Sequence, residues 1–419
     1  MITRFAMVAA LLAIAGCRTT PLTTRLPNVV LIISDDQAWG DFGFMGHPVI
    51  RTPNLDRLAA KSAVFTRGYV PSSLCRPSLA TMITGLYPHQ HRITGNDPPP
   101  GVNRDRMLKH IAAVPTLPKL LATRGYRSLQ TGKWWEGNCR CGDFTDGMTH
   151  GDPTRGGRHG DDGLKIGRKT MQPIYDFVAD CDQQPFFLWY APFLPHTPHN
   201  PPQRLLTRYQ GLGLSPHVAR YYAMCEWFDE TCGQLLDHLE ERGLRDDTIV
   251  LFAVDNGWIQ RVDRRGYAPR SKRSPNEGGV RTPIMVSWPE HVTPGLRTHL
   301  ASTIDLAPTI LRAGGVQAST DLPGHDLIAA AANETTTDRT VYGEIFSHDV
   351  ADVDNPSRSL RYRWLIRNQW KLIAPSATNA NAELYDIVAD PTEEHDLAKQ
   401  APERVAKLRE VLDQWWPPQ

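Results

Sequence analysis

The chain has 419 residues, of which 41% are hydrophobic and 22% charged, a balance typical of proteins that fold around a buried core. Its length exceeds what one hydrophobic core usually holds, so one large domain with a smaller one is expected. The net charge of +1, without any basic run, argues against nucleic acid as a partner.

The first 17 residues have the features of an export signal. Arg4 precedes an apolar stretch at residues 5–15, too short to span a bilayer, and the segment ends in Ile-Ala-Gly-Cys. This ending resembles the lipobox of bacterial lipoproteins, in which the cysteine, here Cys17, is lipidated and becomes the new N-terminus. A plain signal peptide with an incidental cysteine is the alternative. In either case we expect an exported protein, periplasmic or at the cell surface, and in the lipoprotein case it would meet the membrane only through the lipid anchor at Cys17.

Strands and helices alternate along most of the chain. After a tether at residues 18–26, an unbroken apolar run at residues 29–33 predicts a strand buried on both faces, and residues 185–190 and 249–254 repeat this pattern. Between the last two, residues 218–239 have apolar side chains at helical spacing. The pattern predicts an α/β fold with a mostly parallel central sheet sandwiched by helices.

The character changes after about residue 330. Short strands are expected at residues 341–345 and 370–373 and at the Glu-Leu-Tyr-Asp that begins at residue 383, followed by a helix at residues 403–416. We therefore predict a catalytic domain at 27–330 and, at 331–419, a smaller antiparallel sheet closed by a helix. Residues 138–163, rich in Gly, Asp, His and Arg, predict a long loop.

Seven cysteines divide unevenly for an exported chain, where disulfides are permitted. Apart from Cys17 and Cys75, an odd number remains, so at least one is unpaired: Cys139, Cys141, Cys181, Cys225 and Cys232. A metal clip at the Cys-x-Cys is weakly supported without paired histidines, and a loop disulfide or free thiols are favoured.

Polar residues follow two of the expected strands. Asp35 and Asp36 end the first, and Asp255 and Asn256 end the strand at 249–254. Because open α/β sheets bind ligands at the carboxyl ends of their strands, these oxygens could share a site for Ca²⁺ or Mg²⁺. An acidic pair after a strand is, by itself, more often turn chemistry or a helix cap.

Cys75 lies before a predicted helix in which Pro77 is placed as the first residue and Gly85 as the stop. A helix N-terminus favours an anion and a nucleophile, although a lone cysteine there is more often inert or disulfide-bonded.

Together these pieces resemble the sulfatase family, within the alkaline phosphatase superfamily. Cys75-Arg76-Pro77-Ser78, followed by Thr84-Gly85, resembles the signature whose cysteine is oxidised to formylglycine. Further matches run in order along the chain: PNVVLIISDD from 27, TPNLDRLA from 52, TGKW from 131, APFLPHTP from 191, VDNG from 254, KRSPNEGGVRTP from 272, IDLAPT from 304 and ELYD from 383.

The resemblance implies a role for each matched residue. Asp35, Asp36, Asp255 and Asn256 would hold a divalent cation, usually Ca²⁺ in this family. The hydrated aldehyde made from Cys75 would attack sulfur, His196 would protonate the leaving oxygen, and Lys133 and Lys272 would bind sulfate oxygens. The plainer alternatives are a Lys133 stem lying along apolar surface, a His196 that only holds a loop, and a Lys272 in a solvated basic patch.

Two positions depart from the family pattern. The arginine usual four residues after the cysteine is Leu79, and the histidine usual in Gly-Lys-Trp-His is Trp135. Neither side chain can supply the missing charge or proton acceptor. Replacement groups, a variant chemistry or a weak site are the explanations, with replacement candidates Arg76, His89, His91, His150 and His159.

We therefore expect an active but atypical sulfuric ester hydrolase matured by a formylglycine-generating or sulfatase-maturing enzyme. The expected substrate is a sulfated small molecule or glycan, which residues 138–163 with Trp134, Trp135 and Trp258 could line. The alternatives are a phosphodiesterase or phosphonate monoester hydrolase of the same superfamily, and a non-catalytic lipoprotein that binds sulfated glycans.

Overall fold

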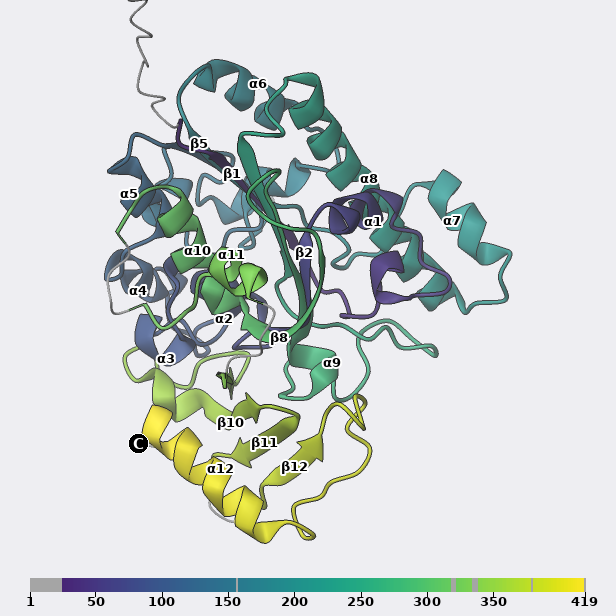
Figure 1. The fold of residues 1–419 in the computed structure, drawn as a ribbon, viewed down its shortest axis with the longest axis vertical. Helices are drawn as coiled ribbons and strands as arrows, with labels where there is room; N and C mark the ends of the chain where they lie inside the picture. The colour runs from purple at the N-terminus through teal and green to yellow at the C-terminus, as the bar shows by residue number, and fades with distance from the viewer. Residues whose placement is uncertain (1–24, 156, 318–321, 334–337, 378–379, 418–419) are drawn as a thin grey trace, which may run out of the picture.

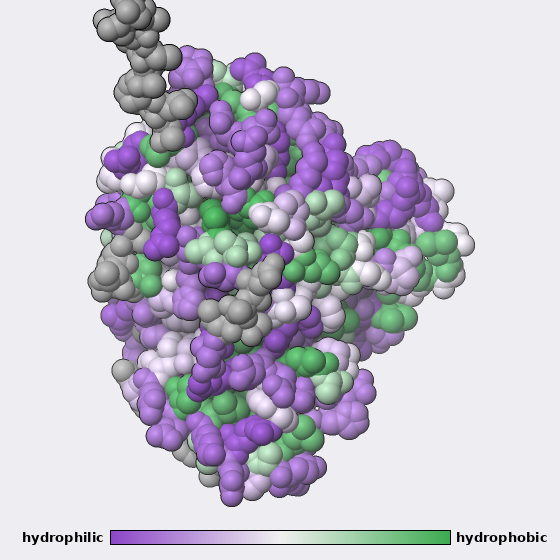
Figure 2. All heavy atoms as spheres, in the orientation of Figure 1, coloured by the Kyte–Doolittle hydropathy of each residue, from purple (hydrophilic) through white to green (hydrophobic). Residues whose placement is uncertain are grey.

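The computed structural model describes residues 25–155, 157–317, 322–333, 338–377 and 380–417, so Cys17 and the export signal lie outside the described residues. A large layered body carries a small sheet and the C-terminal helix at one end, at the bottom of Figure 1. Within the described ranges, no helix is both long and apolar enough to cross a membrane. The face drawn in Figure 2 is largely hydrophilic, with hydrophobic residues in separate small groups.

The central sheet has eight strands in the order β4-β3-β5-β1-β6-β7-β2-β8. Only β7 runs antiparallel to its two neighbours, and every other pair is parallel, so the expected mostly parallel sheet is confirmed. The strands are β1 (Asn28–Ser34), β2 (Ala63–Tyr69), β3 (Arg127–Gly132), β4 (Asp146–Gly147), β5 (Phe186–Ala191), β6 (Thr248–Val254), β7 (Arg281–Ser287) and β8 (Gly295–Ser302).

Helices cover both faces of this sheet (Figure 1). On β1, Val29, Leu31 and Ile33 join one hydrophobic cluster, and Val30 and Ile32 join the other. Successive side chains of a strand point to opposite faces, so an unbroken apolar run is what a two-sided core requires. The first cluster includes residues of α2 (Cys75–Thr84), α5 (Leu117–Ala122), α10 (Leu306–Ala313) and α11 (Leu327–Ala332), and the second includes residues of α1 (Pro53–Ala60), α6 (Gln172–Cys181) and α8 (Pro216–Glu241).

Four further helices lie in the connections: α3 (Pro88–His91), α4 (Lys109–Ala112), α7 (Gln203–Gln210) and α9 (Glu277–Val280). The expected loop at 138–163 is irregular apart from β4 and three short 3₁₀ turns. None of the six cysteines in the described ranges forms a disulfide, which leaves the free-thiol alternative for this part of the chain.

The second sheet is antiparallel throughout, in the order β12-β11-β10-β9. Its strands are β9 (Thr340–Phe346), β10 (Leu360–Arg367), β11 (Trp370–Pro375) and β12 (Glu383–Asp386), and α12 (Pro402–Trp415) packs Leu408 and Leu412 against Leu365 and Leu372. The expected antiparallel sheet closed by a helix is confirmed, with β10 as an additional strand. Its first strand, β9, begins at Thr340, on the C-terminal side of the predicted domain boundary at residues 330/331.

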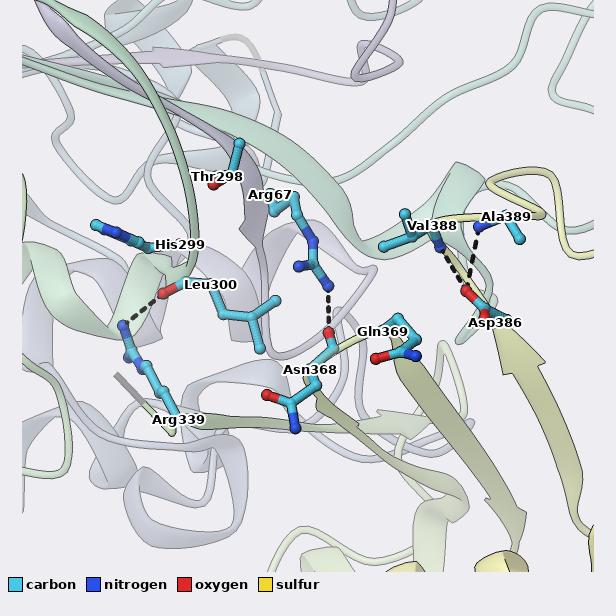
Figure 3. A pocket seen from close by; sticks show the side chains of 10 residues that line it. All are labelled: Arg67, Thr298, His299, Leu300, Arg339, Asn368, Gln369, Asp386, Val388 and Ala389. Carbon is cyan, nitrogen blue, oxygen red and sulfur yellow. Dashed lines mark hydrogen bonds between the residues drawn. The ribbon is translucent and has the colours of Figure 1, made fainter. Parts of the chain in front are cut away.

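Figure 3 shows a cavity of about 380 Å³ where β2 and β8 meet the smaller sheet. Several polar groups in view are paired: Arg67 donates to the carbonyl of Asn368, Arg339 donates to the carbonyl of Leu300 at 3.2 Å, and the backbone amides of Val388 and Ala389 donate to Asp386. Nearby, the buried Lys371 ammonium bridges Glu277 and Glu393 at 2.9 Å each. These contacts join the two sheets, and none of the candidate site residues lines this cavity.

Candidate active site

Four neighbouring parallel strands deliver the candidate residues to one edge of the central sheet. In the order β3-β5-β1-β6, all four strands end at the same side. The residues that follow them are Lys133 after β3, His196 after β5, Asp35 and Asp36 after β1, and Asp255 and Asn256 after β6. The topology therefore brings together side chains that are far apart in the sequence.

The pairing of β1 with β6 sets the geometry of the acidic residues. Ser34 pairs with Val254, so the residues that follow leave the sheet side by side. The Asp36 backbone amide donates to Asp255 Oδ1 at 3.1 Å, and the Asn256 amide donates to Asp36 Oδ1 at 2.7 Å. Asp36 has a φ of 61°, a left-handed conformation that aspartate tolerates better than most residues. Such strained positions gather at functional sites.

Three buried oxygens at this edge have no hydrogen-bond partner within the described residues: Asp35 Oδ2, Asp36 Oδ2 and Asn256 Oδ1. A buried oxygen without a partner is costly, and convergent carboxylate and amide oxygens are the ligands that Ca²⁺ and Mg²⁺ take. Metal-ligating atoms of Asp35, Asp36, Cys75 and His196 lie within 4.8 Å of one another. The residues fit a divalent cation.

Two buried lysines balance the carboxylates. Lys133 Nζ lies 2.5 Å from Asp35 Oδ1 and 3.2 Å from Asp255 Oδ2, and Lys272 Nζ lies 2.5 Å from Asp36 Oδ1. Burial opposes a charge on Lys272, but Asp36 and the other anionic groups raise its pKa. Burial likewise opposes ionisation of Asp36, but Lys272, His196 and Lys133 hold the pKa of this carboxyl below its usual value. These pairings make Lys272 a fixed cation of the site and not part of a solvated patch.

Cys75 lies at the centre of this group. The helix α2 begins at Cys75 itself, two residues before the predicted start at Pro77, and ends at Gly85 with a φ of 71°. The Lys272 ammonium donates to Cys75 Sγ at 3.1 Å. Burial raises the pKa of the Cys75 thiol to about 12, although both lysines favour the thiolate. The unmodified side chain is therefore a protonated thiol at neutral pH and a poor nucleophile.

His196 approaches Asp36, one of the candidate metal ligands, from the β5 side. Its Nδ1 lies 2.6 Å from the Thr197 carbonyl, which can only accept, so Nδ1 carries a hydrogen and Nε2 is the atom that can gain or lose a proton. Nε2 lies 3.4 Å from Asp36 Oδ2. The sequence did not single out Arg168, which holds this segment by donating to the carbonyls of Phe193 at 2.7 Å and His196 at 2.9 Å.

Comparisons with known proteins identify the family. The sequence profile described as Sulfatase matches residues 27–316, and a second, for the C-terminal part of N-sulphoglucosamine sulphohydrolase, matches residues 268–415. Human arylsulfatase A is 32% identical over an alignment that covers 72% of this chain and 67% of its own length. The chain belongs to the sulfatase family.

Further similarities extend along the chain. An N-acetylgalactosamine-6-O-sulfatase of Bacteroides thetaiotaomicron is 25% identical, with 93% of each chain covered. Among solved structures, a protein in complex with its substrate D-glucosamine-2-N,6-O-disulfate shares the fold, with a TM-score of 0.74, 19% identity and coverage of 93% of this chain and 97% of the other. The alkaline-phosphatase-like architecture expected from the motifs is confirmed.

This sulfatase departs from the family pattern at two positions, Leu79 and Trp135. Leu79 is buried in the hydrophobic cluster that includes Cys75, and its side chain can donate no hydrogen bond to the site. The Trp135 ring is also buried, between the guanidinium groups of Arg104 and Arg158 at 5.2 and 5.4 Å from the ring centroid. Neither residue restores the polar group that the family usually has at its position.

The structure separates the five replacement candidates. Arg76 is bound to Glu136, His89 to Glu344, and His91 to Thr81, so these three are engaged elsewhere. His150 lies 3.6 Å from Asp162 with 47% of its side chain exposed. These contacts argue against all four residues as replacements for the missing polar groups.

His159 remains, from the loop at 138–163. Its ring centroid lies 4.6 Å from that of Trp135 and 6.1 Å from that of His196. Burial, reinforced by Lys133, lowers the pKa of His159 to about 3. It stands as a neutral imidazole next to the position where the family usually has its histidine.

A cavity of about 610 Å³ opens beside this group, with His159, Phe193 and His196 in its wall. Trp134 and Trp135 line a different cavity, of about 360 Å³, together with Arg158. Trp258 is buried against Tyr221 and Tyr267 and lines neither, so the expectation that it lines a sugar site is wrong. The larger cavity shares His196 with the Cys75 group, and the sequence did not single out its residues His199, His217, Arg220 and Arg265.

Proposed function

We propose that this sulfatase is an exported enzyme that releases sulfate from a sulfated carbohydrate with a formylglycine made from Cys75 and a divalent cation. The observation that carries the proposal is the double contact of Lys272, whose ammonium reaches both Cys75 Sγ at 3.1 Å and Asp36 Oδ1 at 2.5 Å. It links the signature cysteine directly to the predicted cation ligands in one buried group.

Asp35, Asp36, Asp255 and Asn256 would hold the cation, and we propose Ca²⁺, with Mg²⁺ as the alternative. Asp35 Oδ2, Asp36 Oδ2 and Asn256 Oδ1, the three unpartnered oxygens, support this assignment because a bound cation would satisfy them. When bound, the cation supplies positive charge that polarises the sulfate group.

Cys75 fits conversion to formylglycine better than direct catalysis by sulfur. As a thiol it remains protonated at neutral pH, since its pKa is raised to about 12. Hydrated formylglycine supplies an oxygen nucleophile for sulfur in this family. The conversion requires a formylglycine-generating or sulfatase-maturing enzyme as a partner.

The remaining roles, sulfate binding and proton donation, would belong to Lys133, Lys272 and His196. The two ammonium groups flank Cys75 and would bind sulfate oxygens, where negative charge grows during transfer. His196 would protonate the leaving oxygen from Nε2, because its Nδ1 hydrogen is held by the Thr197 carbonyl. Burial lowers the pKa of His196 well below its usual value, and Asp36, 3.4 Å from Nε2, partly offsets this effect by favouring the protonated ring.

His159 is our choice for the proton acceptor that Trp135 cannot be. It is the one of the five candidates that lines the cavity beside His196. Burial lowers its pKa to about 3, so the ring is neutral with a free acceptor nitrogen, and it would act as a weak base only while sulfate is released.

Export through a lipidated Cys17 and the carbohydrate substrate complete the proposal. The first rests on the Ile-Ala-Gly-Cys sequence at residues 14–17. The second is supported by the similarity to an N-acetylgalactosamine-6-O-sulfatase over 93% of the chain.

The test is mass analysis of the Cys75 peptide from the native host, followed by rates on aryl sulfate and aryl phosphonate esters. We expect an aldehyde at Cys75 and faster hydrolysis of the sulfate ester, which His196→Ala abolishes. An unmodified thiol would contradict the formylglycine, and full activity in His196→Ala would contradict the proton donor. Faster phosphonate hydrolysis would favour the phosphonate monoester hydrolase, and binding of sulfated glycans without turnover the non-catalytic alternative.

A further inference from the structure

The cavity beside His196 is lined by basic side chains without an acidic counterpart. Its volume is about 610 Å³, and the described residues in its wall include two arginines and four histidines but no aspartate or glutamate. The basic residues are His159, His196, His199, His217, Arg220 and Arg265. In a protein with almost equal numbers of basic and acidic residues, such a one-sided wall needs a physical reason.

Four separate segments supply these groups, and His159 comes from the loop at 138–163. His217 and Arg220 lie in the first turns of α8, His199 follows β5, and Arg265 belongs to the connection after β6. The N-terminal end of the 26-residue α8 adds a partial positive charge to that of Arg220. Convergence of four segments on one cavity distinguishes this group from a basic run within one segment.

The two guanidinium groups are free to take a ligand. Among the described residues, no carboxylate oxygen lies within the 4.0 Å of an ion pair from either Arg220 or Arg265. The adjacent arginines are paired: Arg261 lies 3.0 Å and Arg264 3.8 Å from Asp263. An acceptor for Arg220 and Arg265 must therefore come from a bound molecule or from solvent.

His196 divides this cavity from the cluster that would hold the scissile sulfate. Its Nε2 lies 3.4 Å from Asp36, while its ring lines the cavity. An anion at Arg220 and Arg265 would thus be a second one, on the leaving-group side of the proton donor. Burial lowers the pKa of His199 to about 4, so at neutral pH this residue offers hydrogen bonds and not charge.

We propose that the cavity recognises a second anionic group of the substrate, a sulfate or a carboxylate. This inference rests on the proposed function and narrows it to glycans that carry another negative charge close to the sulfate ester that is hydrolysed. Guanidinium groups bind such oxyanions through paired, charge-assisted hydrogen bonds. A neutral monosulfated sugar would leave both arginines with water alone.

The test uses the full, formylglycine-containing enzyme and pairs of substrates that differ by one anion. Hexosamine 6-sulfates with and without a second sulfate at N2, O3 or O4 form one arm, and the same sugars joined to a uronic acid or its neutral hexose form the other. The readout is kcat/KM for 6-sulfate release, or the inhibition constant against 4-nitrophenyl sulfate where a sugar is not turned over.

We expect at least one doubly charged sugar to be preferred by roughly tenfold over its singly charged parent at low salt, and less at high salt. The double substitution Arg220→Gln with Arg265→Gln should bring this ratio close to one. Arg264→Gln, which alters an exposed arginine of the same connection outside the cavity, should keep the ratio. A general loss of folding would lower both rates and leave the ratio unchanged.

Equal kcat/KM or inhibition constants within every pair would overturn the inference, as would a ratio that survives loss of both arginines. A preference in the disulfated pairs would identify the second anion as a sulfate, and a preference in the uronic acid pairs would identify it as a carboxylate. Failure of the proposed function has a different signature, since fully converted wild-type enzyme would then hydrolyse neither 4-nitrophenyl sulfate nor any of the sugars.

Discussion

Arg76 and Glu136 form a buried, two-pronged ion pair, with Arg76 Nε 2.6 Å from Glu136 Oε1 and Nη2 2.7 Å from Oε2. The same guanidinium donates to the carbonyls of Gly95 and Met107 at 3.2 Å each. Because Arg76 follows Cys75 and Glu136 follows Trp135, the pair fixes the first turn of α2 to the segment that carries Lys133. Arg76 therefore supports the position of the site through its ion pair with Glu136. It does not replace the arginine that the family usually has where this chain has Leu79.

Glu136→Gln should lower the free energy of unfolding by about 3–5 kcal/mol, because it leaves the charge of Arg76 buried without a partner. Chemical denaturation measures this change. Asp237→Asn is the control, since it breaks the Arg57–Asp237 pair, whose side chains are 40% and 52% exposed. Exposed pairs contribute less than about 1 kcal/mol. Similar losses in both variants would show that the buried pair is not a special support of the site.

The strands with continuous apolar runs were predictable because both of their faces are buried. The sequence located β1, β5 and β6 to within a residue or two for this reason. It missed β8, whose first residues are largely exposed and whose burial begins only at Leu300. β2 was also missed, since the partly exposed Thr66 and Arg67 interrupt its apolar pattern in mid-strand.

The sequence predicted the residues of the candidate site that directly follow a clearly patterned strand. Asp35, Asp36, Asp255 and Asn256 follow strands whose patterns are clear, and neighbouring parallel strands end together. By contrast, the Arg76–Glu136 pair joins residues 60 positions apart, and no local pattern encodes it. The basic cavity is likewise assembled from three connections and the start of α8, so its charge appears only once the chain has folded.

Ca²⁺ should raise the melting temperature of the wild type, and Asp255→Asn should remove most of this rise. A ligand at a hundred times its dissociation constant stabilises by about 2.7 kcal/mol, and Asp255 is fully buried among the proposed ligands. Differential scanning calorimetry with and without a chelator measures both effects.

The matched control is Asp349→Asn, in the second group of carboxylates that Asp97, His348 and Asp349 form at the surface. This variant should keep the full response to Ca²⁺. Loss of the response in Asp349→Asn, with retention in Asp255→Asn, would place the cation at the surface group.

The stability of the fold should depend on pH through Asp41. Burial raises the pKa of this carboxyl from 3.8 to about 7, although Tyr221 donates to it at 2.6 Å. Between these values the folded state keeps a proton that the unfolded state has lost, so stability falls as pH rises. Asp41→Asn removes the titration, and its melting temperature relative to wild type should increase from about pH 5 to about pH 8. A difference that stays constant with pH would assign Asp41 an ordinary pKa.

His159→Ala should lower kcat for sulfate ester hydrolysis by about a hundredfold, with a smaller change in KM, if His159 supplies the proton acceptor that Trp135 lacks. Because the proposed role follows departure of the alcohol, the variant should release a burst of 4-nitrophenol from 4-nitrophenyl sulfate before a slow steady state. His150→Ala is the matched control from the same loop, as its side chain is 47% exposed and pairs with Asp162. A variant that loses the first burst as well would have lost alcohol release, and His159 would then belong with His196 on the leaving-group side of the reaction.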